Sequence, residues 1–282
     1  MGEQSVSGFA LEQKYAALLK VADATIRSLA SSIDIGEISR HNYGYRRYRE
    51  NPYRWFVGAE RFRYLRALDL ILSSNTDGTV CDLGCFIPFL PVCLSLAGLR
   101  VKIVDKYSLY SEAFKAAVER TISDHDIEIF DLDLLRDDFS SLGKNDIVLM
   151  MAVIEHLNGS PKGLMEKSRE IIRPGGFLLF EVPNLAEFSR RVSFLRGKSP
   201  LPEYEDYFLS EYPFAGHNRE MTVEEVEFLF SRTRFAIDFL DCYDYHEDPI
   251  PGLRIAIHRW IRKLAPVKNK GQAILVRARP VP

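Results

Sequence analysis

Apolar and polar positions alternate through the middle of the chain in blocks that predict strands and helices in turn. Short apolar runs have the length and composition of strands buried on both faces, and the segments between them carry helical spacing. Strands are expected at 79–84, 101–105, 127–130, 146–152 and 176–182, and helices at 89–98, 110–121 and 162–172. This alternation predicts a doubly wound α/β fold with a mostly parallel sheet and a ligand crevice at the carboxyl ends of its strands.

The segments on either side of this core have other patterns. Residues 9–31 place apolar groups at helical spacing, which predicts one amphipathic helix, and another helix is expected at roughly 58–73. Residues 184–220 are rich in proline, aromatic and charged residues, which predicts an inserted flap. In the sequence TVEEVEFLF that follows, Thr222 and Glu225 are spaced as a capping box at the start of a helix.

The C-terminal part carries two more apolar runs, 235–243 and 272–280, which predict strands. Between them, segment 252–264 predicts a basic amphipathic helix, which could dock on the sheet, on a second subunit of a homodimer or, less favourably, on a membrane surface. The expected organisation is a helical cap or lid (1–75), a ligand-binding core (76–183), a substrate flap (184–220) and a C-terminal part of the core with the inserted amphipathic helix (221–282).

Composition and charge narrow the class of protein. A chain of 282 residues with 46% hydrophobic content can bury the core of one α/β domain with added elements. The net charge of −2 disfavours a protein built to hold nucleic acid, which normally carries a basic excess. No secretory signal is visible and the four cysteines show no metal-ligand pairing with histidine, so a reducing, cytoplasmic location is expected.

Carboxylates stand at the ends of successive predicted strands. Asp82 and Gly84 close the first strand, and Asp105 closes the second. A carboxylate at the second position can accept both ribose hydroxyls of an adenosine cofactor, because it offers only acceptor atoms. After the third strand, Asp133, with Asp131 as the other candidate, could accept the adenine amino group.

Four segments in this order resemble the class I S-adenosylmethionine-dependent methyltransferases, especially the small-molecule branch that includes the ubiquinone-biosynthesis type. They are VCDLGC, DIVLMMAVIEHL, EIIRPGGFLLFEVPN and, more loosely, HNREMTVEEVEFLFSRTRFAIDFLD. The resemblance covers residues 78–182 well and implies a Rossmann-like sheet of seven strands whose last strand inserts antiparallel. It also implies S-adenosylmethionine as the cofactor, with the binding residues Asp82, Gly84, Cys85, Phe86, Asp105, Asp133, Leu134 and Met151.

The turn after the first strand departs from that pattern. Phe86 and Pro88 stand where the family usually keeps small residues, although proline is acceptable at the start of a helix. An unusual but functional loop is favoured over a non-catalytic, methyltransferase-like binding module, because the carboxylates and Gly84 remain. A Rossmann dehydrogenase is disfavoured, since only the first glycine of its G-x-G-x-x-G turn is present.

Methyl transfer from a sulfonium needs an aligned acceptor and, for an oxygen nucleophile, a base that takes its proton. Glu155 and His156 follow the fourth strand, where such a base would lie, and His217 in the flap is another candidate. The alternative for each is a structural role in capping or loop packing. No spacing of histidine and acidic residues along the chain predicts a metal site.

Segment 43–56 interleaves arginine with tyrosine and tryptophan. It predicts a lid that binds an anionic substrate, an RNA-binding surface, or a helical cap whose rings pack on the domain and whose arginines are solvated. The favoured function is S-adenosylmethionine-dependent methylation of an oxygen on a small molecule, such as a sugar or glycan precursor. The alternatives are the binding module and an RNA-modifying methyltransferase.

Overall fold

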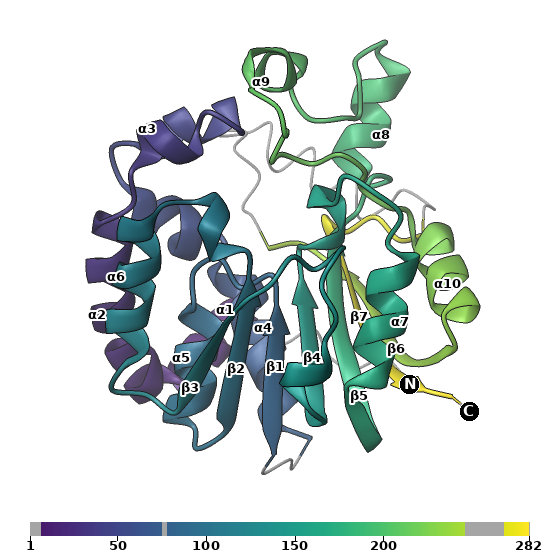
Figure 1. Cartoon of the computed structure of the whole chain (residues 1–282). Coiled ribbons are helices and arrows are strands. Elements are labelled where there is room, and N and C mark those ends of the chain that lie inside the picture. The colour runs from purple at the N-terminus through teal and green to yellow at the C-terminus, as the bar shows by residue number, and fades with distance from the viewer. Residues whose placement is uncertain (1–6, 75–77, 246–267, 282) are drawn as a thin grey trace.

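The computed structural model describes residues 7–74, 78–245 and 268–281, and within them seven strands form one sheet in the order β3-β2-β1-β4-β5-β7-β6 (Figure 1). β7 is antiparallel to both of its neighbours, β5 and β6, whereas the pairs among β1 to β5 are parallel. The strands are β1 (Thr79–Leu83), β2 (Arg100–Asp105), β3 (Ile127–Asp131), β4 (Asn145–Met151), β5 (Ile172–Pro183), β6 (Phe235–Tyr243) and β7 (Ala273–Pro280). The expected sheet, with its inserted antiparallel last strand, is confirmed.

Helices surround the sheet and extend past the carboxyl ends of its strands. The α-helices are α1 (Gly8–Lys14), α2 (Ala16–Ser31), α3 (Ile35–Ile38), α4 (Arg61–Leu72), α5 (Phe89–Leu96), α6 (Glu112–Ile122), α7 (Lys162–Glu170), α8 (Phe188–Leu195), α9 (Tyr204–Leu209) and α10 (Val223–Arg232). Short 3-10 helices lie at η1 (Tyr43–Tyr48), η3 (Tyr107–Leu109), η4 (Ser140–Leu142) and η5 (Ile154–His156), and a short π-helix lies at η2 (Arg54–Gly58). In the described part of the chain, no helix is both long enough and apolar enough to span a bilayer.

The two faces of the sheet bury separate hydrophobic clusters because successive side chains of a strand point to opposite sides. In β1, Val80 belongs to the cluster that includes buried residues of α1 to α6. Its neighbour Cys81 belongs to the other cluster, which includes residues of α7 and α10. Both clusters include residues of β4, β5 and β7, so the centre of the sheet is covered on both faces.

Two of the expected helices have other bounds in the structure, and a third lies outside the described residues. The helix expected at 9–31 is two helices, because the backbone leaves helical geometry at Tyr15, whose hydroxyl donates to Asp69 of α4 at 2.7 Å. The helix expected at 58–73 begins only at Arg61, after the wide turn η2. The expected helix at 252–264 lies outside the described residues.

The helix α10 forms as its sequence predicts. The Thr222 hydroxyl accepts the backbone N–H of Glu225 at 3.3 Å, and the Glu225 carboxylate accepts the backbone N–H of Thr222 at 2.8 Å. This reciprocal capping box satisfies two donors that a helix otherwise leaves unpaired at its start. It fixes the first turn of α10 directly after the flap.

Candidate functional site

The turn after β1 requires glycine for two reasons that are visible in the structure. Gly84 has φ +80°, a conformation that side chains disfavour, and its N–H donates to the carbonyl of Val104 at 2.7 Å. A Cβ atom on Gly84 would lie 2.6 Å from Cγ2 of Val153, in the segment after β4. The glycine therefore lets the ends of β1, β2 and β4 approach one another closely.

Two desolvated carboxylates stand at this edge. Burial raises the pKa of Asp82 to about 7, and burial raises the pKa of Asp105 to about 7 as well. Asp105 accepts the backbone N–H of Lys106 at 2.7 Å and lies 3.4 Å from the hydroxyl of Tyr110. Among the described residues, neither Asp82 nor Asp105 forms an ion pair, so both keep acceptor capacity for a ligand.

The ring of Phe86 lies among other aromatic rings, half-buried beside helix α6. Its centroid is 4.9 Å from Tyr110 and 5.2 Å from Phe114, and it meets Phe56 of the N-terminal segment edge-on at 5.2 Å. Pro88 is the N-cap residue of α5. The bulky residues of this turn thus have packing partners within the protein.

The carboxylates after β3 are already engaged. Asp133 accepts the ammonium of Lys106 at 2.8 Å and the N–H of Leu135 at 3.0 Å. Burial is the largest single influence on the pKa of Asp133 and raises it, but the hydrogen bonds from Lys106, Leu135 and Arg136 and the charge of Lys106 together lower it below the ordinary value. Asp131 pairs with Lys115 at 3.0 Å. The two other expected lining residues, Leu134 and Met151, are half-buried against the two hydrophobic clusters.

The segment after β4 holds a buried carboxyl group. Ala152 adopts φ +54°, an uncommon conformation for alanine that costs of order 1 kcal/mol, and its N–H donates to the carbonyl of Glu181. Glu155 then lies fully buried, at 0% exposure, and neither carboxylate oxygen has a hydrogen-bond partner among the residues that the structure describes. Burial raises the pKa of Glu155 to about 8.

The fold brings His156 and His217 together, although they were separate candidates in the sequence. Their ring centroids are 4.8 Å apart with planes at 82°. Nδ1 of His156 lies 2.9 Å from the carbonyl of Ala215, and Nδ1 of His217 lies 2.5 Å from Oε1 of Glu220. Burial lowers the pKa of His156, and burial lowers the pKa of His217 to about 3, so both rings are neutral at pH 7.

A buried charge network lies beside this cluster, and sequence reasoning missed it. Arg63 of α4 pairs with Glu60 and places Nε 2.8 Å from Oε1 of Glu181 in β5. The hydroxyl of Tyr243 donates to the other oxygen of Glu181 at 2.6 Å. Charges on Glu60, Glu181 and Arg63 all act on Glu155, which places these four groups in one electrostatic environment.

The cap and the flap meet above the strand ends and form a roof, defined here as segments 40–56 and 204–217 (Figure 1). The N–H of Ala215 donates to the carbonyl of His41 at 2.7 Å, and Arg47 pairs with Asp206 at 2.7 Å. In segment 43–56 the aromatic rings pack together, with Phe56 buried beneath Tyr45 and Tyr48. The four arginines of this segment are exposed. This packing favours the helical-cap interpretation of segment 43–56 over a continuous basic surface.

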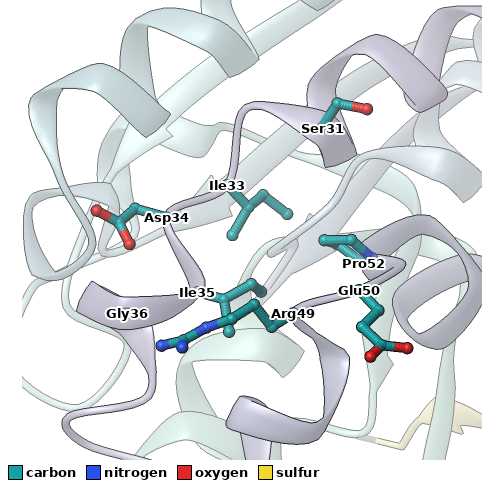
Figure 2. A pocket seen from close by; sticks show the side chains of 8 residues that line it. All are labelled: Ser31, Ile33, Asp34, Ile35, Gly36, Arg49, Glu50 and Pro52. Carbon is teal, nitrogen blue, oxygen red and sulfur yellow. The ribbon is translucent and has the colours of Figure 1, made fainter.

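A hollow of about 510 Å³ also occurs in the N-terminal part of the chain (Figure 2). It is lined by Ser31, Ile33, Asp34, Ile35, Gly36, Arg49, Glu50 and Pro52. None of these residues belongs to the segments that carry the carboxylates or histidines of the strand ends. We therefore place the candidate site at the strand ends and not in this hollow.

Comparison with known proteins gives a family and a fold. The model of a methyltransferase domain family matches residues 45–236. The chain is similar to the magnesium protoporphyrin IX methyltransferase ChlM from Synechocystis PCC 6803 with bound SAH, at 12% identity and a TM-score of 0.56, covering 88% of this chain and 99% of that one. No curated protein matches the sequence.

A second solved structure has the same fold. The N-methyltransferase NodS from Bradyrhizobium japonicum WM9, in complex with S-adenosyl-L-homocysteine, is 16% identical with a TM-score of 0.51, covering 92% of this chain and 99% of that one. A SAM-dependent methyltransferase from Archaeoglobus fulgidus is 16% identical with a TM-score of 0.53, covering 79% and 98%. At these identities the likeness concerns the fold alone.

Replacing Arg63 with methionine should lower the free energy of unfolding by about 3–5 kcal/mol, because it leaves buried carboxylates without their cation. Urea denaturation measures this loss. Arg66→Met is the matched control on the same helix, since Arg66 pairs with the half-exposed Asp241 and should contribute about 1 kcal/mol or less. Equal losses in the two variants would contradict the importance of the buried network.

Proposed function

The chain belongs to the methyltransferase-domain family, whose model matches residues 45–236, and we propose that it transfers a methyl group from S-adenosylmethionine to an oxygen of a small molecule. S-adenosylmethionine is the cofactor of this family and fold. The observation that carries the proposal is the pair of desolvated carboxylates Asp82 and Asp105 at the ends of adjacent strands, which form no ion pair with any described residue. Such carboxylates keep acceptor atoms for donors from a ligand.

In this proposal the donor molecule lies across the carboxyl ends of β1 to β4. Asp105 accepts the ribose hydroxyls, and the close backbone approach at Gly84 admits the methionine end. Asp82 offers acceptor atoms beside that end. Asp133, held in place by Lys106, accepts the adenine amino group, and Asp131 is the other candidate. The remaining lining residues are Cys85, Phe86, Leu134 and Met151.

The acceptor would approach from the roof side, where Glu155, His156 and His217 lie. In an in-line displacement the acceptor oxygen attacks the methyl carbon while the carbon–sulfur bond breaks and its electron pair stays on sulfur. The hydroxyl proton must leave in the same step or before it. A neutral imidazole can accept that proton, and both histidines keep Nε2 unengaged by the hydrogen bonds described above. This supports an oxygen nucleophile.

The acceptor itself is proposed from the family resemblance and from the enclosed setting. A roof of tyrosine and histidine side chains offers hydroxyl and ring nitrogen partners to a polar molecule, which suits a sugar or glycan precursor. The exposed arginines at 46, 49 and 54 could meet an anionic group on the same molecule. Neither feature calls for a nucleic-acid partner.

Acceptor class is tested by incubating the protein with methyl-labelled S-adenosylmethionine and a panel of sugars and glycan precursors, with amino-sugar analogues as competitors. We expect label on a hydroxyl oxygen, recovered as an ether that survives mild acid and base. Transfer only to amino groups would contradict the proposed oxygen acceptor while leaving methyl transfer intact.

Asp105→Ala should weaken binding of S-adenosylhomocysteine more than tenfold, or by more than 1.4 kcal/mol, because the ribose loses its acceptor. Isothermal titration calorimetry measures the dissociation constant. The matched control is Asp126→Ala, an exposed aspartate at the opposite edge of the sheet, which should leave the affinity unchanged. Unchanged affinity in Asp105→Ala would mean that another group holds the ribose.

Affinity for S-adenosylhomocysteine should rise with pH up to about pH 7 and then level off. Burial raises the pKa of both Asp82 and Asp105 to about 7, so each is protonated below that pH and accepts fewer hydrogen bonds. The affinity should fall by up to tenfold per pH unit for each carboxylate that must ionise. Titrations between pH 5.5 and 8.5 test this, with Asp105→Asn expected to show a smaller slope. A flat profile in the unmodified protein would contradict it.

A further inference from the structure

Glu155, His156 and His217 form a cluster of three potential metal ligands at the carboxyl end of β4. One donor atom from each lies within 4.8 Å of the other two. The segment that carries His217 is bound to the segment that carries the other two, because the N–H of Asn218 donates to the carbonyl of Glu155 at 2.6 Å and its side-chain amide to the carbonyl of His156 at 3.1 Å. These hydrogen bonds to backbone carbonyls hold the two segments together and so keep the three side chains close to one another.

Both imidazoles are oriented as metal-binding histidines are. Nδ1 of His156 donates to the carbonyl of Ala215, and Nδ1 of His217 donates to the carboxylate of Glu220, which also pairs with Arg190. A carbonyl or carboxylate partner at one ring nitrogen fixes the tautomer and leaves the lone pair on the other nitrogen. Among the described residues no hydrogen bond engages Nε2 of either ring, which leaves this nitrogen as the donor atom for a ligand.

Glu155 supplies an independent sign that a ligand is needed. Its side chain is fully buried, and neither oxygen forms a hydrogen bond or an ion pair among the described residues. A buried carboxylate without a partner is costly, because it loses water and gains nothing in exchange. The nearby Arg63 pairs with Glu60 and Glu181 and, among the described residues, forms no ion pair with Glu155.

We propose that this cluster binds one divalent transition-metal ion through Glu155, His156 and His217. The role of this metal in catalysis rests on the proposed methyltransferase function, whereas the binding of the metal does not. Ligand atoms around a tetrahedral ion at ~2.1 Å lie roughly 3.4 Å apart, so donor atoms that now lie within 4.8 Å of one another need to approach by about 1.4 Å at most. Two imidazoles and one carboxylate suit zinc, iron, cobalt or manganese better than calcium or magnesium, which prefer oxygen ligands.

Three protein ligands leave a coordination position for the acceptor, as in catalytic metal sites. An acceptor hydroxyl bound there loses its proton to solvent more readily, because the cation stabilises the alkoxide. The alkoxide oxygen then bonds to the methyl carbon as the carbon–sulfur bond breaks, with the electron pair leaving on sulfur. With the metal bound, Nε2 of each imidazole is a ligand and does not take the proton, so the base role proposed above applies only to the metal-free site.

The test is a titration of the chelator-treated full chain with Co²⁺, without cofactor or acceptor. We expect one equivalent to bind, with visible absorption bands typical of nitrogen and oxygen ligation, and Zn²⁺ to displace it. Glu155→Gln and His217→Gln should each weaken binding at least tenfold. His125→Gln is the matched control, since this histidine lies in the turn before β3 and should leave binding unchanged.

Unfolding in urea separates loss of the site from loss of the fold. Metal-free Glu155→Gln should be as stable as the unmodified protein or more stable, because the amide removes a buried uncompensated carboxyl. Zn²⁺ should raise the midpoint of the unmodified protein and not that of the variant. Absence of a bound equivalent, or equal binding by the glutamine variants, would overturn the metal site.

Titration of the same metal-free samples with S-adenosylhomocysteine distinguishes the two proposals. Binding of this cofactor product by a protein that takes up no Co²⁺ would overturn the metal site and leave the proposed function standing. Failure to bind the cofactor product, with or without Co²⁺, would overturn the proposed function whatever the metal result.

Discussion

The candidate site depends on the burial of carboxyl side chains where the strands of the sheet end. Asp82, Asp105 and Glu155 all stand on strands or turns that the hydrophobic clusters hold in place, and burial raises the pKa of each. Among the described residues none of them forms an ion pair, although the charge of Arg63 acts on Glu155. The carboxyl groups thus keep acceptor atoms for a ligand where three strands end.

Much of the fold could be predicted because its signals are local. Successive side chains of a strand point to opposite faces, which assigns Val80 and Cys81 to different clusters. Apolar runs bounded by glycine and charged residues mark where the strands lie. The capping box at Thr222 and Glu225 is likewise written in four consecutive residues. The antiparallel insertion of the last strand followed from the family resemblance, since the pairing of β7 between β5 and β6 depends on contacts that periodicity does not encode.

The site was predictable only in part because its other half depends on long-range contacts. The predicted strand ends identify which aspartates lie there, so Asp82 and Asp105 could be named as candidates from the sequence. The pairing of Arg63 with Glu181 joins a helix to a strand far along the chain, and each residue looks ordinary in its own segment. His156 and His217 likewise meet only when the flap folds back, so no spacing along the sequence could predict their contact.

The backbone of one residue, Ala215, contacts both the cap and a candidate site histidine. Its N–H donates to the carbonyl of His41 in the cap, and the carbonyl of the same residue holds Nδ1 of His156. If the cap were lifted from the flap, the N–H of Ala215 would lose its partner at His41, and the neighbouring contact that orients the imidazole would weaken. The orientation of His156 therefore depends on the packing of the cap against the flap.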